Sequence, residues 1–142
     1  MVEVIHIPYP TTEAGKKQWN KLYGLNAYYS GKHWSKRQED ARFWHALTWA
    51  AMTKGKCRKT PFESPVILTF YFNDRMDCSN HAMIVKMIED AMKGRIIQDD
   101  GKKWVKGIES YFHNEDYILV IIREAYSKRE RFYSSPFSSA KR

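Results

Sequence analysis

The sequence has little of what marks several large classes of protein. Only two of its 142 residues are cysteines, Cys57 and Cys78, and no CxxC pair is present, so neither a disulfide framework nor a structural zinc site is indicated. No apolar run approaches the ~20 residues that a membrane-spanning helix needs. The first residues lack the basic-then-apolar order of a signal peptide. These absences predict a cytoplasmic protein with free thiols and no membrane partner.

Material for a core is plentiful. Hydrophobic residues make up 43% of the chain and charged residues 28%, and the chain has 7 Phe, 5 Trp and 9 Tyr. This length suits one domain and is too short for two with full cores. We expect one domain over residues 1–124, followed by a basic, serine-rich tail over residues 125–142 that has little to bury and is flexible.

The positive charge is concentrated near the N-terminus. The chain carries a formal charge of +8, and residues 15–37 hold six cations and no acid. Aromatic side chains lie between these cations, a mixture that suits a groove for nucleic acid, where cations neutralise phosphates and rings stack on bases. The alternative is a solvated basic loop whose aromatics anchor it to the core. Charge alone does not decide between a polyanionic partner and simple solubility.

The first half of the chain predicts one strand and one long helix. Val2 to Ile7 alternates apolar and polar residues, as a strand does, whereas residues 11–33 look irregular. Ser35 to Gln38 fits a capping box, and a helix follows to about Lys54. Its expected buried stripe consists of Phe43, Leu47, Ala50 and Ala51.

The second half predicts a buried strand, a helix and further strands. Val66 to Phe72 is rich in β-branched and aromatic residues. A helix over 81–93 follows, with Asn80 as its N-cap, Glu89 pointing away from the core, and Lys86 and Asp90 at the margin of the apolar face. Its expected apolar face consists of Met83, Ile84, Met87, Ile88 and Ala91.

Three strands are expected to complete the sheet. Ile96-Ile97 predicts a short strand, and 104–112 and 117–123 predict an antiparallel pair. The predicted fold class is mixed α/β (α+β), with a central mixed sheet packed against two main helices.

Acidic residues follow two of the expected strands. Residues 74–100 carry a local charge of −2 inside this basic chain, and Asp77, Asp99 and Asp100 all stand at predicted strand ends. Neighbouring parallel strands would bring these three carboxylates together as ligands for Mg²⁺ or Mn²⁺, which would activate a water for attack on phosphorus, with Lys86 stabilising the transition state. The alternative for Asp-Asp-Gly is an ordinary turn.

The order of these residues resembles the signature of the RusA-type Holliday junction resolvases. The likeness begins with Asp77-Cys78-Ser79-Asn80, continues through Lys86 and Asp90, and closes with Ile96-Ile97-Gln98-Asp99-Asp100. Upstream, Ile7-Pro8-Tyr9-Pro10 and Leu25-Asn26-Ala27-Tyr28-Tyr29 are similar to the family's opening strand and following loop. Members of the family are small dimeric nucleases that bind four-way DNA junctions and cut them symmetrically with a divalent metal.

The resemblance implies a site for this chain. Catalytic roles fall to Asp77, Lys86, Asp99 and Asp100, and metal binding falls to Asp77, Asp99 and Asp100 with Asp90. The predicted DNA-binding surface consists of Lys16, Lys17, Lys21, Asn26, Tyr29, Lys32, Lys36 and Arg37. The predicted partners are branched DNA and a second copy of the chain.

Two alternatives remain open from the sequence. Ser79 stands where the family commonly has a second aspartate, so the chain could be a structure-selective DNA-binding protein whose cleavage is weakened or lost. A third reading keeps nuclease chemistry but builds the site from Asp77 with Asp100-Gly101-Lys102, as in restriction-type nucleases.

Overall fold

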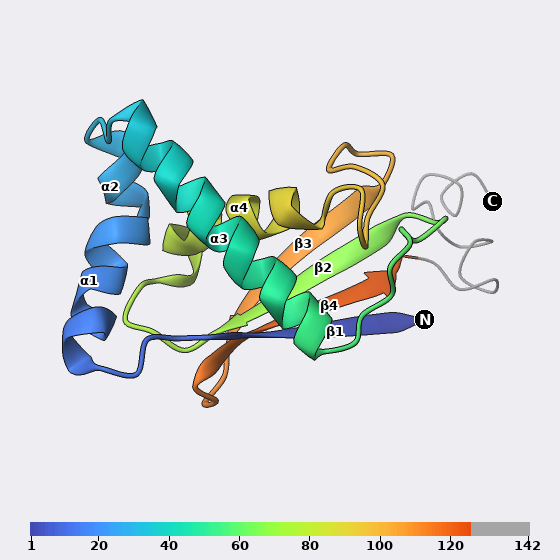
Figure 1. Ribbon diagram of the computed structural model, residues 1–142, viewed down its shortest axis with the longest axis horizontal. Coiled ribbons are helices and arrows are strands. Elements are labelled where there is room, and N and C mark those ends of the chain that lie inside the picture. Colours follow the sequence, from blue (N-terminus) through green and yellow to red (C-terminus); the bar gives the residue numbers. More distant parts are fainter. Residues whose placement is uncertain (126–142) are drawn as a thin grey trace, which may run out of the picture.

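The computed structural model describes residues 1–125, which form a four-stranded mixed sheet with helices packed on it. Figure 1 shows helices α3 and α4 lying across the sheet, with α1 and α2 at one end of the molecule. The predicted mixed α/β fold class is therefore confirmed. None of the helices within the described residues is both long enough and apolar enough to cross a membrane. The predicted tail lies, apart from Ala125, outside the described residues.

The sheet has the order β1-β4-β2-β3. Its strands are β1 (Val2–Pro8), β2 (Val66–Phe72), β3 (Val105–Phe112) and β4 (Tyr117–Glu124). β4 pairs antiparallel with β1 and β2, and β2 pairs parallel with β3. The prediction that the last two strands pair with each other is wrong, because β2 lies between them. β2 is the most apolar strand, and the central position buries Leu68, Phe70 and Phe72 completely.

The prediction of an irregular segment over residues 11–33 is wrong. The segment forms α1 (Glu13–Tyr23) and α2 (Leu25–Tyr29). Thr12 caps α1, since its side-chain oxygen accepts a hydrogen bond from the N–H of Gly15 at 3.0 Å. Trp19 and Tyr23, four residues apart on one face of α1, are buried and meet Trp44 with ring centroids 5.0 and 5.3 Å away. Aromatic packing therefore gives α1 its place in the core.

Helix α3 (Trp34–Lys54) is present as predicted, but the residues on its buried face are shifted by one position along the sequence from the predicted stripe. The residues of α3 that are buried are Trp44, Thr48, Ala51 and Met52. Phe43, expected in the core, is 47% exposed because Trp44 takes the place between the rings of α1. The expected capping box is also wrong, since the side chain of His33 caps α3 by accepting from the N–H of Ser35 at 3.2 Å.

The predicted second helix consists of a 3-10 turn, η1 (Cys78–His81), and α4 (Ala82–Met92). Its apolar face is largely as predicted, but the expectation for Glu89 is wrong, because Glu89 is only 5% exposed. The predicted strand at Ile96-Ile97 is also wrong. These residues are buried but make only one isolated bridge, between Ile97 and Lys93. The strand parallel to β2 is β3 instead.

Candidate functional site

Acidic side chains gather where the last turn of α4 meets the loop that leads toward β3. Glu89 and Asp90 come from α4, and Asp100 comes from the loop. One carboxylate oxygen of each residue lies within 4.8 Å of the others. Glu89 is buried, while Asp90 and Asp100 are half-buried. We call these three residues the acidic group.

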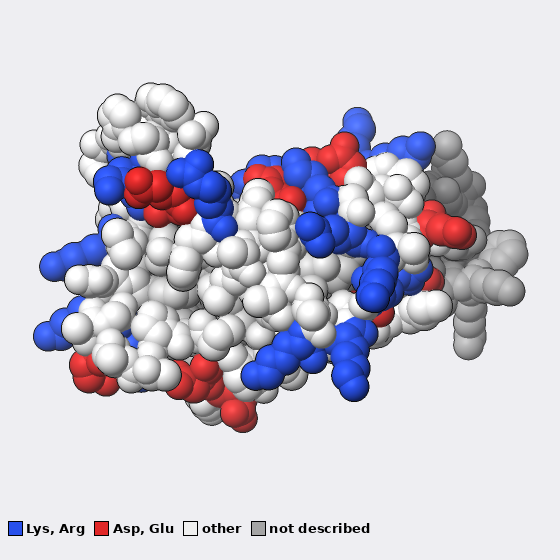
Figure 2. Space-filling view, viewed as in Figure 1, with Lys and Arg blue, Asp and Glu red and all other residues white. Residues whose placement is uncertain are grey.

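Two lysines compensate part of the charge of the acidic group. Lys86 Nζ donates a hydrogen bond to Asp100 and lies 3.3 Å from Asp90 Oδ1 and 3.5 Å from Glu89 Oε1. Lys93 Nζ lies 3.2 Å from Asp90 Oδ1 and 3.4 Å from Asp100 Oδ2. Figure 2 shows acidic and basic side chains intermingled over this part of the molecule.

The charges of the group follow from these contacts. The hydrogen bond from Lys86 holds the pKa of Asp100 well below its usual value, and the same bond raises the pKa of Lys86. The ion pair with Asp90 raises the pKa of Lys93. Burial, by contrast, raises the pKa of Glu89. Three close oxygens of this kind can hold a divalent cation, which would relieve the repulsion between them.

The acidic group differs from the expected set of ligands. The structure brings together Lys86, Asp90 and Asp100 from the predicted residues, and adds Glu89. The sequence reasoning missed Glu89, although its spacing of three from Lys86 places both on one edge of the helix. Glu89 lies on the side of α4 that faces β3, a tertiary relationship that a helical projection of α4 alone does not show.

Asp77 and Asp99 do not belong to the acidic group. Asp77 precedes η1, at the other end of α4, and the helix rises by about 12 Å between Ala82 and Asp90. Asp99 Oδ1 accepts a hydrogen bond from the N–H of Asp100 at 2.9 Å, the contact of an ordinary turn. The prediction that Asp77 lies close to Asp99 and Asp100 depended on a strand at Ile96-Ile97 beside β2. Without that strand, the sheet topology supplies no reason for Asp77 to lie beside Asp100 and Lys102.

A groove connects the η1 turn with the acidic group. It has a volume of about 510 Å³ and runs between α4 and β3. Ser79 lines it at one end, Lys86 and Glu89 line it beside the acidic group, and Ile108 and Ser110 of β3 form the opposite wall. Ser79 and Lys86, two positions of the sequence signature, therefore face the same groove.

Part of the predicted DNA-binding surface is free of protein partners. Lys16, Lys17 and Lys21 are exposed on α1 and form no ion pair with any described residue. Cationic side chains project at the end of the molecule that α1 occupies (Figures 1 and 2). Tyr29 is 78% exposed and Asn26 is also exposed. These five residues are available to a phosphate backbone.

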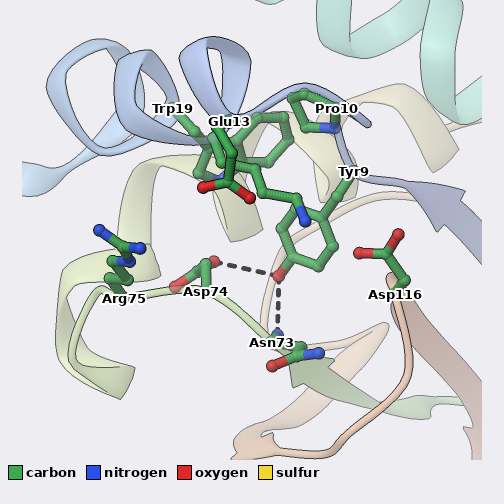
Figure 3. A pocket seen from close by; sticks show the side chains of 9 residues that line it. Tyr9, Pro10, Glu13, Trp19, Asn73, Asp74, Arg75 and Asp116 are labelled. Carbon is green, nitrogen blue, oxygen red and sulfur yellow. Dashed lines mark hydrogen bonds between the residues drawn. The ribbon is translucent and has the colours of Figure 1, made fainter.

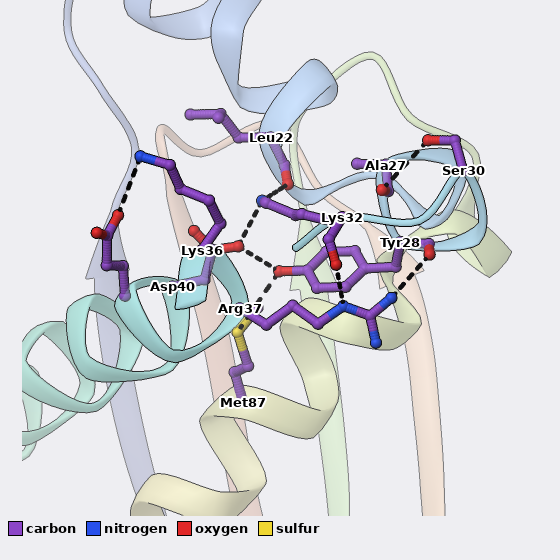
Figure 4. A network of polar contacts seen from close by, with 10 residues as sticks. Leu22, Ala27, Tyr28, Ser30, Lys32, Lys36, Arg37, Asp40 and Met87 are labelled. Atoms are coloured by element: carbon purple, nitrogen blue, oxygen red, sulfur yellow. Dashed lines mark hydrogen bonds and ion pairs between the residues drawn. The ribbon is translucent and has the colours of Figure 1, made fainter. Parts of the chain in front are cut away.

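Other cations of that surface have internal contacts, as Figure 4 shows. Lys32 Nζ pairs with the Asp40 carboxylate and donates to the carbonyl oxygen of Leu22 at 2.7 Å. Arg37 donates to the carbonyl oxygens of Lys32 at 2.9 Å and Tyr28 at 3.0 Å. These contacts hold the turn between α2 and α3.

Lys36 and the phenol of Tyr28 make further contacts near the turn between α2 and α3. The ammonium of Lys36 pairs with Glu39 at 3.4 Å in an exposed position, so Lys36 remains accessible. Tyr28 donates a 2.6 Å hydrogen bond to Asp40, and burial together with that bond raises the pKa of Tyr28. Lys32 and Arg37 therefore contribute to the fold, whatever they contribute to binding.

A second polar network lies under a pocket of about 280 Å³ (Figure 3). Tyr9 donates to Asp74 at 3.0 Å and accepts from the N–H of Asn73 at 2.9 Å. The completely buried ring of His81 contacts Asp74 at 2.8 Å through Nε2. Burial raises the pKa of Tyr9 above its usual value. Because each polar group has a protein partner, this network joins the ends of β1 and β2 to η1.

No protein family model matches the chain, and no curated protein sequence matches it.

Proposed function

We propose that this chain is a divalent-metal-dependent endodeoxyribonuclease that binds four-way DNA junctions and resolves them by paired cleavage. The observation that carries the proposal is the acidic group beside Lys86 at the end of a groove. The resemblance of the sequence signature to RusA-type resolvases supports the choice of branched DNA as substrate. The formal charge of +8 and the unpaired lysines of α1 support a polyanionic partner.

The acidic group fits a Mg²⁺ or Mn²⁺ ion. Glu89, Asp90 and Asp100 offer only oxygen ligands, which both ions prefer. When bound, the ion supplies a Lewis acid for the phosphoryl group and lowers the pKa of a bound water. With a cation compensating Asp100, the ammonium of Lys86 can instead donate to a phosphate oxygen as negative charge develops on it.

The remaining residues of the site orient the DNA. The lysines of α1 neutralise phosphates away from the cutting site. Ile108 and Ser110 present an apolar and a polar contact on the β3 side of the groove, so that a strand can lie between β3 and α4. Paired cleavage requires two such sites, which a homodimer provides.

The test is cleavage of a synthetic four-way junction in Mg²⁺ or Mn²⁺ by matched variants of adjacent aspartates. Asp100→Asn is expected to reduce the cleavage rate more than about 100-fold, because it removes a ligand of the acidic group. Asp99→Asn is the control, because Asp99 carries the same charge one residue away and lies outside the group. Equal losses in both variants, or full cleavage by Asp100→Asn, would contradict the proposal.

A junction-binding protein without cleavage is the second candidate. The specific observation in its favour is that Lys86 and Lys93 already pair with the acidic group and compensate much of its charge. Ser79, in the position of a motif aspartate, also leaves the groove one carboxylate short. A wild-type protein that binds the junction with nanomolar to micromolar affinity but leaves it uncut in Mn²⁺ would establish this candidate.

A further inference from the structure

A further pocket, of about 240 Å³, is separate from the acidic group. It lies where the end of α1 and the start of α2 meet the segment that leads into η1. Three asparagines and an aspartate line it, namely Asn20, Asn26, Asn80 and Asp77. We call it the amide pocket.

The polar side chains of the amide pocket have no protein partners. Asn20 Oδ1 is buried without a hydrogen bond to any residue from 1 to 125. The side chains of Asn26, Asp77 and Asn80 likewise form no hydrogen bond or ion pair with a described residue. A buried acceptor without a partner costs free energy, so its retention in a pocket points to a ligand that satisfies it.

The chemistry of the amide pocket suits the edge of a nucleobase. An asparagine amide offers a donor and an acceptor side by side, the pairing that base edges present, and an aspartate accepts from exocyclic amino groups. Leu25 and the buried Met76 supply apolar surface within the same pocket. An apolar wall beside polar edge contacts is what a flat, polar-edged ring requires.

The amide pocket has one cation in its lining and others in the neighbouring turns of α1. Lys21 follows Asn20 directly, and Lys17 lies one helical turn earlier on α1. Arg75 lines the amide pocket itself and forms no ion pair with a described residue. A nucleotide whose base enters the pocket would therefore meet cations for its own and its neighbouring phosphates.

We infer that the amide pocket binds one nucleobase that has left the base stack at the branch point of the junction. This inference rests on the proposed function, in that it takes DNA as the substrate, and it adds a second contact site to the groove. A paired base cannot enter a recess of this kind, whereas the nucleotides at a branch point are the easiest to unstack. Asp77, which the sequence signature singled out, contacts the base edge in this arrangement.

The experiment measures affinity for two junctions without cleavage. Fluorescence anisotropy in EDTA compares a four-way junction with natural branch nucleotides and the same junction with abasic analogues at those four nucleotides. Wild-type protein is expected to bind the abasic junction about tenfold more weakly, the loss that follows from removing good contacts to a base edge. The double variant Asn26→Ala/Asn80→Ala is expected to bind both junctions equally, since it removes two contacts to the base and any phosphate contact of Asn26 is lost from both junctions alike.

A matched control separates base contacts from phosphate contacts. Lys21→Ala is expected to weaken binding to both junctions by the same factor and to reduce the slope of log affinity against log salt by about one. Circular dichroism of each variant checks the fold, and neither asparagine side chain forms a hydrogen bond or ion pair with a described residue that the substitution would break.

Three results would overturn the inference, and they separate it from the proposed function. If wild-type protein binds both junctions equally, the inferred base contact is wrong, while the proposals of junction binding and cleavage are unaffected. Undiminished discrimination in the double variant means that the base is held elsewhere. No binding of either junction in EDTA overturns the base contact, and cleavage of the natural junction in Mn²⁺ then decides the proposed function independently.

Discussion

Lys86 donates a hydrogen bond to Asp100 across fourteen positions of the sequence, and this contact ties α4 to the loop that leads into β3. The contact places a cation in the middle of three carboxylates. It stabilises the acidic group by charge compensation and would compete with a divalent ion for the same oxygens. In the proposed metal site, the affinity for the ion would therefore depend on the free energy needed to break the Lys86–Asp100 contact.

Metal binding is expected to depend on the acidic group and not on Asp77. Isothermal titration with Mn²⁺ should show one site per chain that Asp100→Asn or Glu89→Gln weakens at least about tenfold, because each removes a negatively charged ligand. Asp77→Asn should bind Mn²⁺ as the wild type does. A loss of affinity in Asp77→Asn equal to that in Asp100→Asn would show that the ion binds at the η1 end of α4 instead.

Glu89→Gln is expected to stabilise the metal-free protein at neutral pH. Burial raises the pKa of Glu89 in the folded state, so ionisation costs stability as pH rises above the usual value of 4.5. The glutamine removes that cost, about 1 kcal/mol for a buried charge with partial compensation. Thermal unfolding should show a higher midpoint for the variant at pH 7 and no difference near pH 4. A variant less stable at pH 7 would mean that the contact with Lys86 outweighs burial.

The Lys86–Asp100 pair is expected to make the protein sensitive to acid. The folded-state pKa of Asp100 lies below its unfolded value of 3.8, so its contribution is fully present above that pH and is lost as pH falls through the folded value. Asp100→Asn should therefore lose less stability than wild type between pH 5 and pH 2. Denaturant unfolding at a series of pH values measures the difference, and parallel curves would contradict it.

Lys32 is expected to matter for stability more than for DNA binding. Its side chain is 13% exposed, that of its partner Asp40 is 12% exposed, and Lys32→Met leaves the aspartate charge uncompensated. We expect a loss of about 2 kcal/mol in the free energy of unfolding. Lys17→Ala, exposed on α1, is the control and should change junction affinity and its salt dependence with little effect on stability. If Lys32→Met weakened junction binding without lowering the free energy of unfolding, Lys32 would belong to the DNA-binding surface.

Strands and helices with strong local signals could be predicted from the sequence. The alternation in Val2–Pro8 and the apolar run Val66–Phe72 define β1 and β2 because such patterns fit a half-buried and a fully buried strand. Pairing between strands was not predictable in the same way. The short connection between β3 and β4 favours a hairpin, but the greater burial of β2 at the centre of the sheet outweighs it.

The site was predictable in part for the same reason. The spacing of Lys86 and Asp90 on one helix edge is a local property, and the structure confirms their contact at 3.3 Å. The position predicted for Asp77 relative to Asp100 depended on which strand lies beside β2, and strand order is set by contacts between residues far apart in the sequence. The tertiary contact that turns Glu89 inward is likewise absent from any local pattern.

The edge-to-face pair of Trp19 and Trp44 gives the molecule an internal spectroscopic reporter. Their indole rings lie 5.0 Å apart at 71°, with one ring on α1 and the other on α3. Near-ultraviolet circular dichroism from such a pair is sensitive to its mutual orientation, so the seating of α1 on the core can be followed optically without a label. If DNA moves α1 when its lysines engage phosphate, this signal will change while the far-ultraviolet spectrum stays constant.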